Sequence, residues 1–346
     1  MKSKGKWIGN LLFLILVITA TLYGLFRNQD LGELMELISG ADWRWWSLGF
    51  VCVVLFILGE SLVFHVIFAA LRTPHRMTHC FLYSFVGFFF SCITPSAGGG
   101  QPAQVYFMRK DGISSAISVP VMILVTITFK MVLILSGVLV FLFRPPAIIS
   151  ALEPVIGWCI LGMFLNVSFV SFYLLLIFRP AIVERMMHFC LRLWEKLFKK
   201  NAEKHREALR DYMERYRGAA ECFRSKRLMV VQVMILSILQ RGILFAVTWL
   251  SMRAFGLHAN PVQVIVLQSI ISLSTDLLPL PGGMGASETL FMYIFPILCG
   301  PELTLPVLMV SRGISYYGQL LISAVFTLVA AFCLGTSKRE KEIHEE

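Results

Sequence analysis

Charged residues are scarce in this sequence. Asp, Glu, Lys and Arg make up 15% of its 346 residues and apolar residues make up 57%, whereas soluble domains contain about 25% charged and about 45 to 50% apolar residues. This composition excludes a soluble globular enzyme. Several apolar runs reach the roughly 20 residues that a helix needs to cross a bilayer. The sequence therefore predicts an all-α polytopic membrane protein.

Motifs for cofactors, metals and nucleotides are also missing. The eight cysteines form no C-x-x-C pair, and most of them lie in apolar runs, where Cys packs as a small hydrophobe. The formal net charge of +10 would suggest nucleic-acid binding in a soluble protein. Here most Lys and Arg residues flank apolar runs, and the excess of these residues in cytoplasmic loops explains the charge. We expect no cofactor, no metal, no ATP site and no nucleic-acid partner.

Hydropathy predicts about six crossing helices, at 7–26, 45–70, 114–143, 155–178, 228–252 and 306–335. The first 20 residues also resemble a secretory signal, with three lysines before an apolar run and the triplet Ile18-Thr19-Ala20. We interpret them as an uncleaved span because the apolar run continues to Phe26, beyond the length of a usual signal core.

The distribution of Lys and Arg predicts the orientation. The segment 179–227 contains 14 Lys and Arg residues and is assigned to the cytoplasm, and both termini fall on the same side. With these spans, the linker and both termini can share the cytoplasmic side only if the segment 79–113 begins and ends on that side and the segment 253–305 begins and ends on the outer side. We therefore predict two re-entrant helical hairpins, in elements 79–113 and 262–300, that enter the membrane from opposite faces.

These assignments divide the chain into two membrane halves, 1–178 and 228–335, joined by a basic helical linker at 179–227 and followed by a cytoplasmic tail at 336–346. In the linker Leu191, Trp194, Phe198 and Ala202 recur at helical spacing. Two interpretations remain open for it: an amphipathic helix on an anionic leaflet, and an ordinary solvated connector.

Each predicted hairpin contains a Pro/Gly break followed by a short helix. Non-helical backbone at membrane depth is tolerated only where it is buried in protein or lines a wet cavity, and paired broken helices form the substrate sites of inverted-repeat transporters. We expect Pro102 in the first turn of one restarting helix, with Ser287 as the cap of the other. A surface loop is the alternative, and a nucleotide loop is disfavoured because no strand precedes it. The candidate substrate-binding residues are Pro95, Gly98, Gly99 and Gln101 in the first break and Pro281, Gly282, Gly283, Gly285 and Glu288 in the second.

Ionisable residues within the spans indicate a polar cavity, because Asp, Lys or Arg at a helix centre costs about 2.5 to 3.5 kcal/mol. Arg312, Tyr316 and Gln319 share one helical stripe, and arginine offers the forked donors that phosphate accepts. Glu288 or Asp276 would hold the cations in the absence of lipid. Structural ion pairs without substrate contact are the alternative. The candidate binding residues at this depth are Lys130, Arg241, Asp276, Arg312 and Tyr316.

The two breaks, Pro95-Ser96-Ala97-Gly98-Gly99 with Gln101-Pro102 and Pro281-Gly282-Gly283-Met284-Gly285 with Glu288, together with the charged linker, resemble the flippase-like family. This family is the membrane region of lysylphosphatidylglycerol synthase, also called the multiple peptide resistance factor. The resemblance covers roughly 7–335. It implies a multi-pass protein of a bacterial or archaeal cell membrane, with inverted repeats, that moves phospholipids or aminoacylated lipids between leaflets and contributes to antibiotic resistance.

In full-length synthases a soluble C-terminal domain transfers lysine to phosphatidylglycerol, but here only a charged tail follows residue 335. We therefore expect no transferase activity from this chain alone. The residues leave open a membrane-embedded head-group transferase, with Glu60 and His65 or Glu288 as base, and a non-catalytic subunit of a separate lipid-modifying synthase. The expected partner is membrane phospholipid, and the sequence is compatible with an oligomer.

Overall fold

The computed structural model describes residues 32, 36, 38–73, 75–94, 97–198, 203–280 and 283–334, and every regular element in these ranges is a helix. Five helices are long and apolar enough to cross a membrane: Trp43–Ala70, Ser115–Phe143, Ile148–Phe178, Arg227–Ala254 and Pro296–Cys333. They correspond to five of the six predicted spans. The predicted span 7–26 and the tail 336–346 lie outside the described residues.

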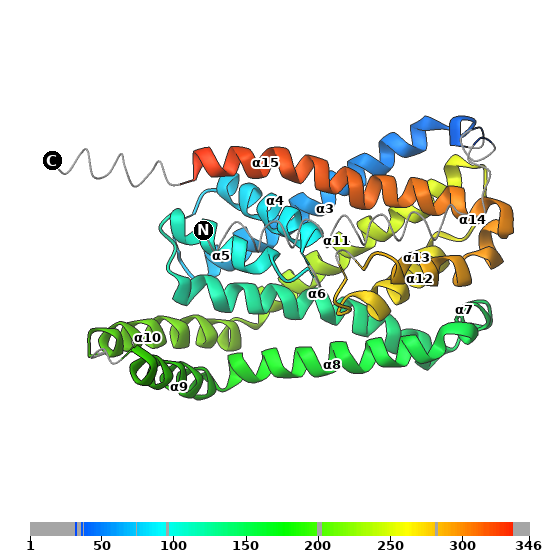
Figure 1. The fold of residues 1–346 in the computed structure, drawn as a ribbon. Helices are drawn as coiled ribbons and strands as arrows, with labels where there is room; N and C mark the ends of the chain where they lie inside the picture. The colour runs from blue at the N-terminus through cyan, green and yellow to red at the C-terminus, as the bar shows by residue number, and fades with distance from the viewer. Residues whose placement is uncertain are drawn as a thin grey trace.

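The long helices run roughly along a common axis (Figure 1). They are α3 (Trp43–Ala70), α6 (Ser115–Phe143), α8 (Ile156–Phe178) and α11 (Arg227–Ala254), and the fifth span is divided between α14 (Pro296–Arg312) and α15 (Gln319–Cys333). Helix α3 packs closely along α11, since a Cβ added at Gly59 would lie 3.0 Å from Cγ of Gln240. Phe56, Ile57 and Val247 continue this contact as part of one apolar cluster.

The first predicted hairpin is a broken helix whose two arms pack on each other. We call it hairpin 1: α4 (Met77–Ile93), a break at 94–99, and α5 (Gly100–Lys110). Gln104 of α5 fits against Gly87 of α4, where an added Cβ would meet its amide nitrogen at 2.1 Å. At the base, His79 Nδ1 lies 2.6 Å from a carboxylate oxygen of Asp111, which also accepts a hydrogen bond from the Tyr83 hydroxyl.

The second broken helix, hairpin 2, consists of α12 (Pro261–Thr275), a break at 276–285, and α13 (Ala286–Ile294). Gly283 and Gly285 have φ values of 69° and 84°, which glycine adopts without strain. The prediction that Ser287 caps α13 is wrong. The cap is Gly285, and Glu288 at the third helical position accepts its N–H at 2.7 Å, since a carboxylate there reaches back to the cap.

The last span begins ten residues before the predicted 306. Helix α14 starts at Pro296 and contains a kink at Gly300, where φ is 72°. A π-helical segment, η2 (Gly313–Gly318), then joins α14 to α15. Hairpin 1 lies toward one end of the bundle and hairpin 2 toward the other (Figure 1).

The predicted linker forms two helices, α9 (Pro180–Phe198) and α10 (Glu203–Ser225), at the same end of the bundle as hairpin 1 (Figure 1). Tyr216 of α10 is fully buried, and its hydroxyl donates to the Leu176 carbonyl of α8 at 3.3 Å. An ion pair between Glu184 and Arg217 connects α9 to α10. The side chains of Trp194 and Phe198 lie outside the described part. The short helix α7 (Pro146–Leu152) and one 3-10 turn (Glu153–Val155) precede α8 at the opposite end.

Candidate functional site

A cavity of about 580 Å³ lies between the two helix breaks. Ala97 and Gly98 of hairpin 1 and Leu280 and Gly283 of hairpin 2 line it, and α3, α6, α8, α11 and α14 supply its walls. Its volume falls within the range of about 300 to 1,000 Å³ that is typical of ligand sites. Segments that are almost two hundred residues apart thus contribute to one site.

One ion pair on the cavity wall joins α6 to the beginning of the second break. Lys130 Nζ lies 2.6 Å from Oδ2 of Asp276 and 3.4 Å from Oδ1 of Asn166. It also lies 4.9 Å from the centre of the Phe169 ring, a distance at which a cation and an aromatic face attract each other. Because α12 ends at Thr275, the ammonium group also lies near the partly negative end of this helix, which stabilises a cation.

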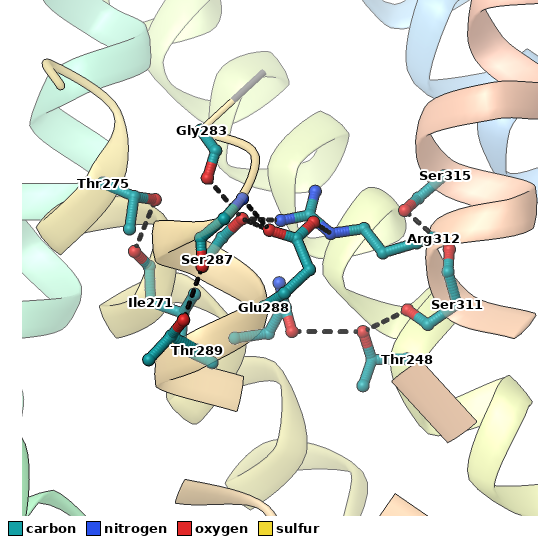
Figure 2. Close-up of polar contacts among 12 residues, drawn as sticks. Thr248, Ile271, Thr275, Gly283, Ser287, Glu288, Thr289, Ser311, Arg312 and Ser315 are labelled. Carbon is teal, nitrogen blue, oxygen red and sulfur yellow. Dashed lines mark hydrogen bonds and ion pairs between the residues drawn. The ribbon is translucent and has the colours of Figure 1, made fainter. Parts of the chain in front are cut away.

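A second ion pair joins the end of α14 to the beginning of α13. Figure 2 shows Arg312 extending toward the carboxylate of Glu288, with its Nε 2.9 Å from Oε1. The guanidinium group also donates to the Ser287 hydroxyl. Nearby, Thr248 of α11 lies 2.9 Å from the Ser311 hydroxyl and donates to Gln268 at 3.2 Å. A cation, a carboxylate and several hydroxyl groups are therefore fixed in one polar layer.

The remaining charged groups of the cavity, Arg241 and Glu60, are arranged differently. The Arg241 guanidinium lies 3.8 Å from the centre of the Phe129 ring, and its buried Nε has no hydrogen-bond partner among the residues that the structure describes. The Glu60 side chain is buried, and Oε1 accepts a hydrogen bond of 2.6 Å from the Gln104 amide. Within the described ranges, neither residue has an oppositely charged group at ion-pair distance.

Comparison with known proteins identifies the family. The family described as the lysylphosphatidylglycerol synthase TM region matches residues 7–323. The chain belongs to this family. The match covers both breaks and nearly all of the described helices, and it confirms the resemblance that the two Pro/Gly motifs and the linker indicated. No curated protein matches the chain.

In this member of the synthase TM-region family, most of the predicted site residues meet at the cavity. Glu288 does not line the cavity, but it forms an ion pair with Arg312, which does. Gly99 and Gly285 belong to the breaks but do not line the cavity: the N–H of Gly99 donates to Thr94 Oγ1 at 2.8 Å, and that of Gly285 to Glu288. Pro95, Pro281 and Gly282 lie outside the described residues. The predicted residues that line the cavity are Gly98, Gln101, Lys130, Arg241, Asp276, Gly283, Arg312 and Tyr316.

The sequence reasoning missed several polar residues in and beside the synthase TM-region cavity: Gln104 and Thr126 line it, and Asn166 lies next to its Lys130. Asn166 is fully buried beside Lys130. A single amide side chain inside an apolar run is the sequence feature that could have identified it. Gln104 contacts Glu60, but a glutamine in a short amphipathic helix gives no distinguishing signal. Thr126 accepts a hydrogen bond of 2.5 Å from Gln101. These contacts join helices that are distant in sequence, so local patterns do not predict them.

The structure does not bring together the Glu60 and His65 pair considered as a catalytic base. Glu60 contacts Gln104, whereas His65 Nδ1 lies 3.0 Å from Nε2 of His75. In an acid–base pair the two groups must lie within hydrogen-bond reach of each other or of the same proton. The geometry therefore gives no support to a head-group transferase that uses these two residues.

Proposed function

We propose that the chain is a lipid translocase that moves an anionic or aminoacylated polar lipid between the leaflets of a bacterial or archaeal cell membrane. One observation carries this proposal: both helix breaks border a single cavity that contains charged side chains of both signs. The membrane environment and the family support a lipid-related function. Movement of lipid requires a polar path through an apolar bundle, and this cavity is suited to form its central part.

The lengths of the first arms, α4 and α12, support the proposal. At 1.5 Å per residue, the 17 residues of α4 and the 15 residues of α12 extend for about 26 Å and about 23 Å, short of the roughly 30 Å of hydrocarbon. The arms of hairpin 1 also pack on each other. We therefore infer that both hairpins are re-entrant and enter from opposite faces, with α9, α10 and both termini in the cytoplasm.

The charged groups provide a path for the head group. Arg312, Arg241 and Lys130 would contact the phosphate in turn, and the carboxylates of Glu288 and Asp276 would balance the cations between binding events. The acyl chains would stay in the bilayer, where the outer surface of α8 is apolar: Phe164 is 68% exposed and Trp158 is 50% exposed. Because the sequence contains no recognisable ATP-binding motif, a lipid or ion gradient, or removal of the moved lipid, would determine its direction.

Reconstitution into liposomes with fluorescent phosphatidylglycerol tests the proposal. Arg312→Ala and Arg241→Ala should each slow lipid movement by about tenfold or more, since a hydrogen bond to a charged group contributes about 1.5 to 3 kcal/mol. Glu184→Gln is the matched control, because it neutralises one member of the ion pair between α9 and α10, away from the cavity. If the two arginine variants move lipid as fast as the parent chain, the site assignment is wrong.

A further inference from the structure

The carboxylate of Glu288 occupies a set of donors that would suit an oxyanion. Its Oε1 lies 2.9 Å from Arg312 Nε, and its Oε2 accepts the N–H of Gly285 at 2.7 Å. The Ser287 hydroxyl lies 3.0 Å from the same Oε2 and 2.8 Å from the Gly283 carbonyl, so its single proton has two acceptors. A guanidinium, a hydroxyl and the N–H groups at a helix start are also the donors that bind phosphate.

The cavity reaches two of these donors but not Glu288 itself. Arg312 and Ser287 line the cavity, whereas Glu288 does not line it and is buried. An anionic group in the cavity would therefore meet the guanidinium and the hydroxyl without first passing the carboxylate. Arg312 is followed by the π-helical segment Gly313–Gly318, a form of backbone that occurs frequently at functional sites.

The other ion pair of the cavity is less suited to such an exchange. Lys130 is held by Asp276, by Asn166 and by the face of Phe169, and it lies at the partly negative end of α12. Removing Asp276 from it would leave a carboxylate near that end, which is unfavourable. In contrast, Glu288 lies at the partly positive start of α13 and accepts the Gly285 N–H, a bond that does not involve Arg312 and would remain available after the exchange.

We propose that Glu288 is an internal competitor of the ligand: a phosphate oxyanion binds to Arg312 and Ser287 by displacing the Glu288 carboxylate, whose return promotes release. The inference rests on the proposed function and adds a regulatory residue to the same site. It predicts that loss of an ion-pair partner raises the binding affinity. Neutralising this buried acidic residue strengthens binding of an anionic head group, whereas a merely structural ion pair would give weaker binding when broken.

Calorimetry on the full chain in phosphatidylcholine nanodiscs tests the sign, with dihexanoyl phosphatidylglycerol as the lipid probe and glycerol phosphate as the probe without acyl chains. Glu288→Gln keeps an acceptor for the Gly285 N–H and removes the charge, and it should bind both probes about five- to tenfold more tightly than the parent. Arg312→Gln should lose most of the binding, and the double variant should bind no better than Arg312→Gln. Glu184→Gln, outside the cavity, should bind like the parent.

Hydrogen exchange of the amides in 286–294 shows whether α13 stays folded in each variant. Equal or weaker binding by Glu288→Gln with α13 intact would overturn the inference, as would a gain for the lipid without any gain for glycerol phosphate. Ser287→Ala provides a second route because it leaves the Glu288 charge in place, and it should weaken binding of both probes; parent-like binding would contradict the site. Tighter binding by Glu288→Gln in a chain that moves no lipid would contradict only the proposed function.

Discussion

Asn166 connects three helices of the cavity through one buried amide. Its Nδ2 donates to the carbonyls of Gly162 at 2.9 Å and Leu273 at 3.0 Å, and its Oδ1 accepts from Lys130 at 3.4 Å. Leu273 lies in the last turn of α12, where carbonyl groups run out of partners within the helix. The amide therefore supports the broken end of α12 and holds the lysine that pairs with Asp276.

Asn166→Ala should destabilise the protein by about 1 to 3 kcal/mol, because it leaves a buried carbonyl without its donor and removes a contact of a buried ammonium group. Thermal unfolding in nanodiscs would measure this loss as a lower midpoint. Ser168→Ala on the exposed face of the same helix is the matched control and should change the midpoint little. A parent-like midpoint for Asn166→Ala would show that the amide contributes no net stability.

At the residue scale, the sequence predicted the charged residues and offered Glu288 or Asp276 as partners of the cations, but it did not predict which cation pairs with which carboxylate. Lys130, Arg241, Asp276 and Arg312 stand out because a charge is costly in an apolar span, and all four line the cavity. Their partners depend on helix packing: Lys130 and Asp276 are 146 residues apart, and no local pattern joins them. The stacking of Arg241 on Phe129 was unpredictable for the same reason.

At the scale of elements, the lack of a side chain at Gly100 allows the two arms of hairpin 1 to pack on each other. A Cβ added at Gly100 would lie 2.1 Å from Ser91 Oγ and 2.6 Å from the Gly87 carbonyl oxygen, closer than atoms in real structures approach. The start of α5 can therefore pack on α4 only because residue 100 has no side chain. This contact sets the position of Gly98 and Gln101, which line the cavity.

Gly100→Ala should push the arms of hairpin 1 apart and cost about 1 to 3 kcal/mol, as overpacking of a tight contact does. The expected result is a lower unfolding midpoint together with faster hydrogen exchange in 97–104. Gly242→Ala in α11 is the control, since an added Cβ there meets nothing within 4 Å and alanine favours a helix; it should leave the midpoint unchanged or raise it. Equal midpoints for both variants would contradict this packing argument.

Elements were predictable wherever Pro and Gly interrupt an apolar run, because these residues break a helix for reasons that are local to the backbone. Both breaks and five of the long helices could therefore be placed from the sequence. The cap at Gly285 was missed because a positive φ in a glycine-rich segment can fall on any of its glycines. The π-helical segment at Gly313–Gly318 has no recognisable sequence signal.

At the scale of the whole molecule, the two hairpins lie toward opposite ends of one bundle and their breaks share a cavity (Figure 1). This arrangement is what inverted repeats around a midplane site would produce. Orientation in a membrane follows from the linker: α9 and α10 carry many basic residues and lie at the same end as hairpin 1. By the positive-inside rule, that end is expected in the cytoplasm.

Sided cysteine labelling would test this orientation in cells and inverted vesicles. Arg109→Cys, at the base of hairpin 1, and Glu207→Cys, in α10, are exposed positions and should react with a membrane-impermeant maleimide only in inverted vesicles. Val262→Cys, at the base of hairpin 2 and 66% exposed, should react only in intact cells, after removal of any outer membrane. Peptide mass spectrometry assigns the label by position, so the native cysteines can stay. If positions 109 and 262 reacted from the same side, the hairpins would not enter from opposite faces, and the proposed inverted arrangement around the cavity would be wrong.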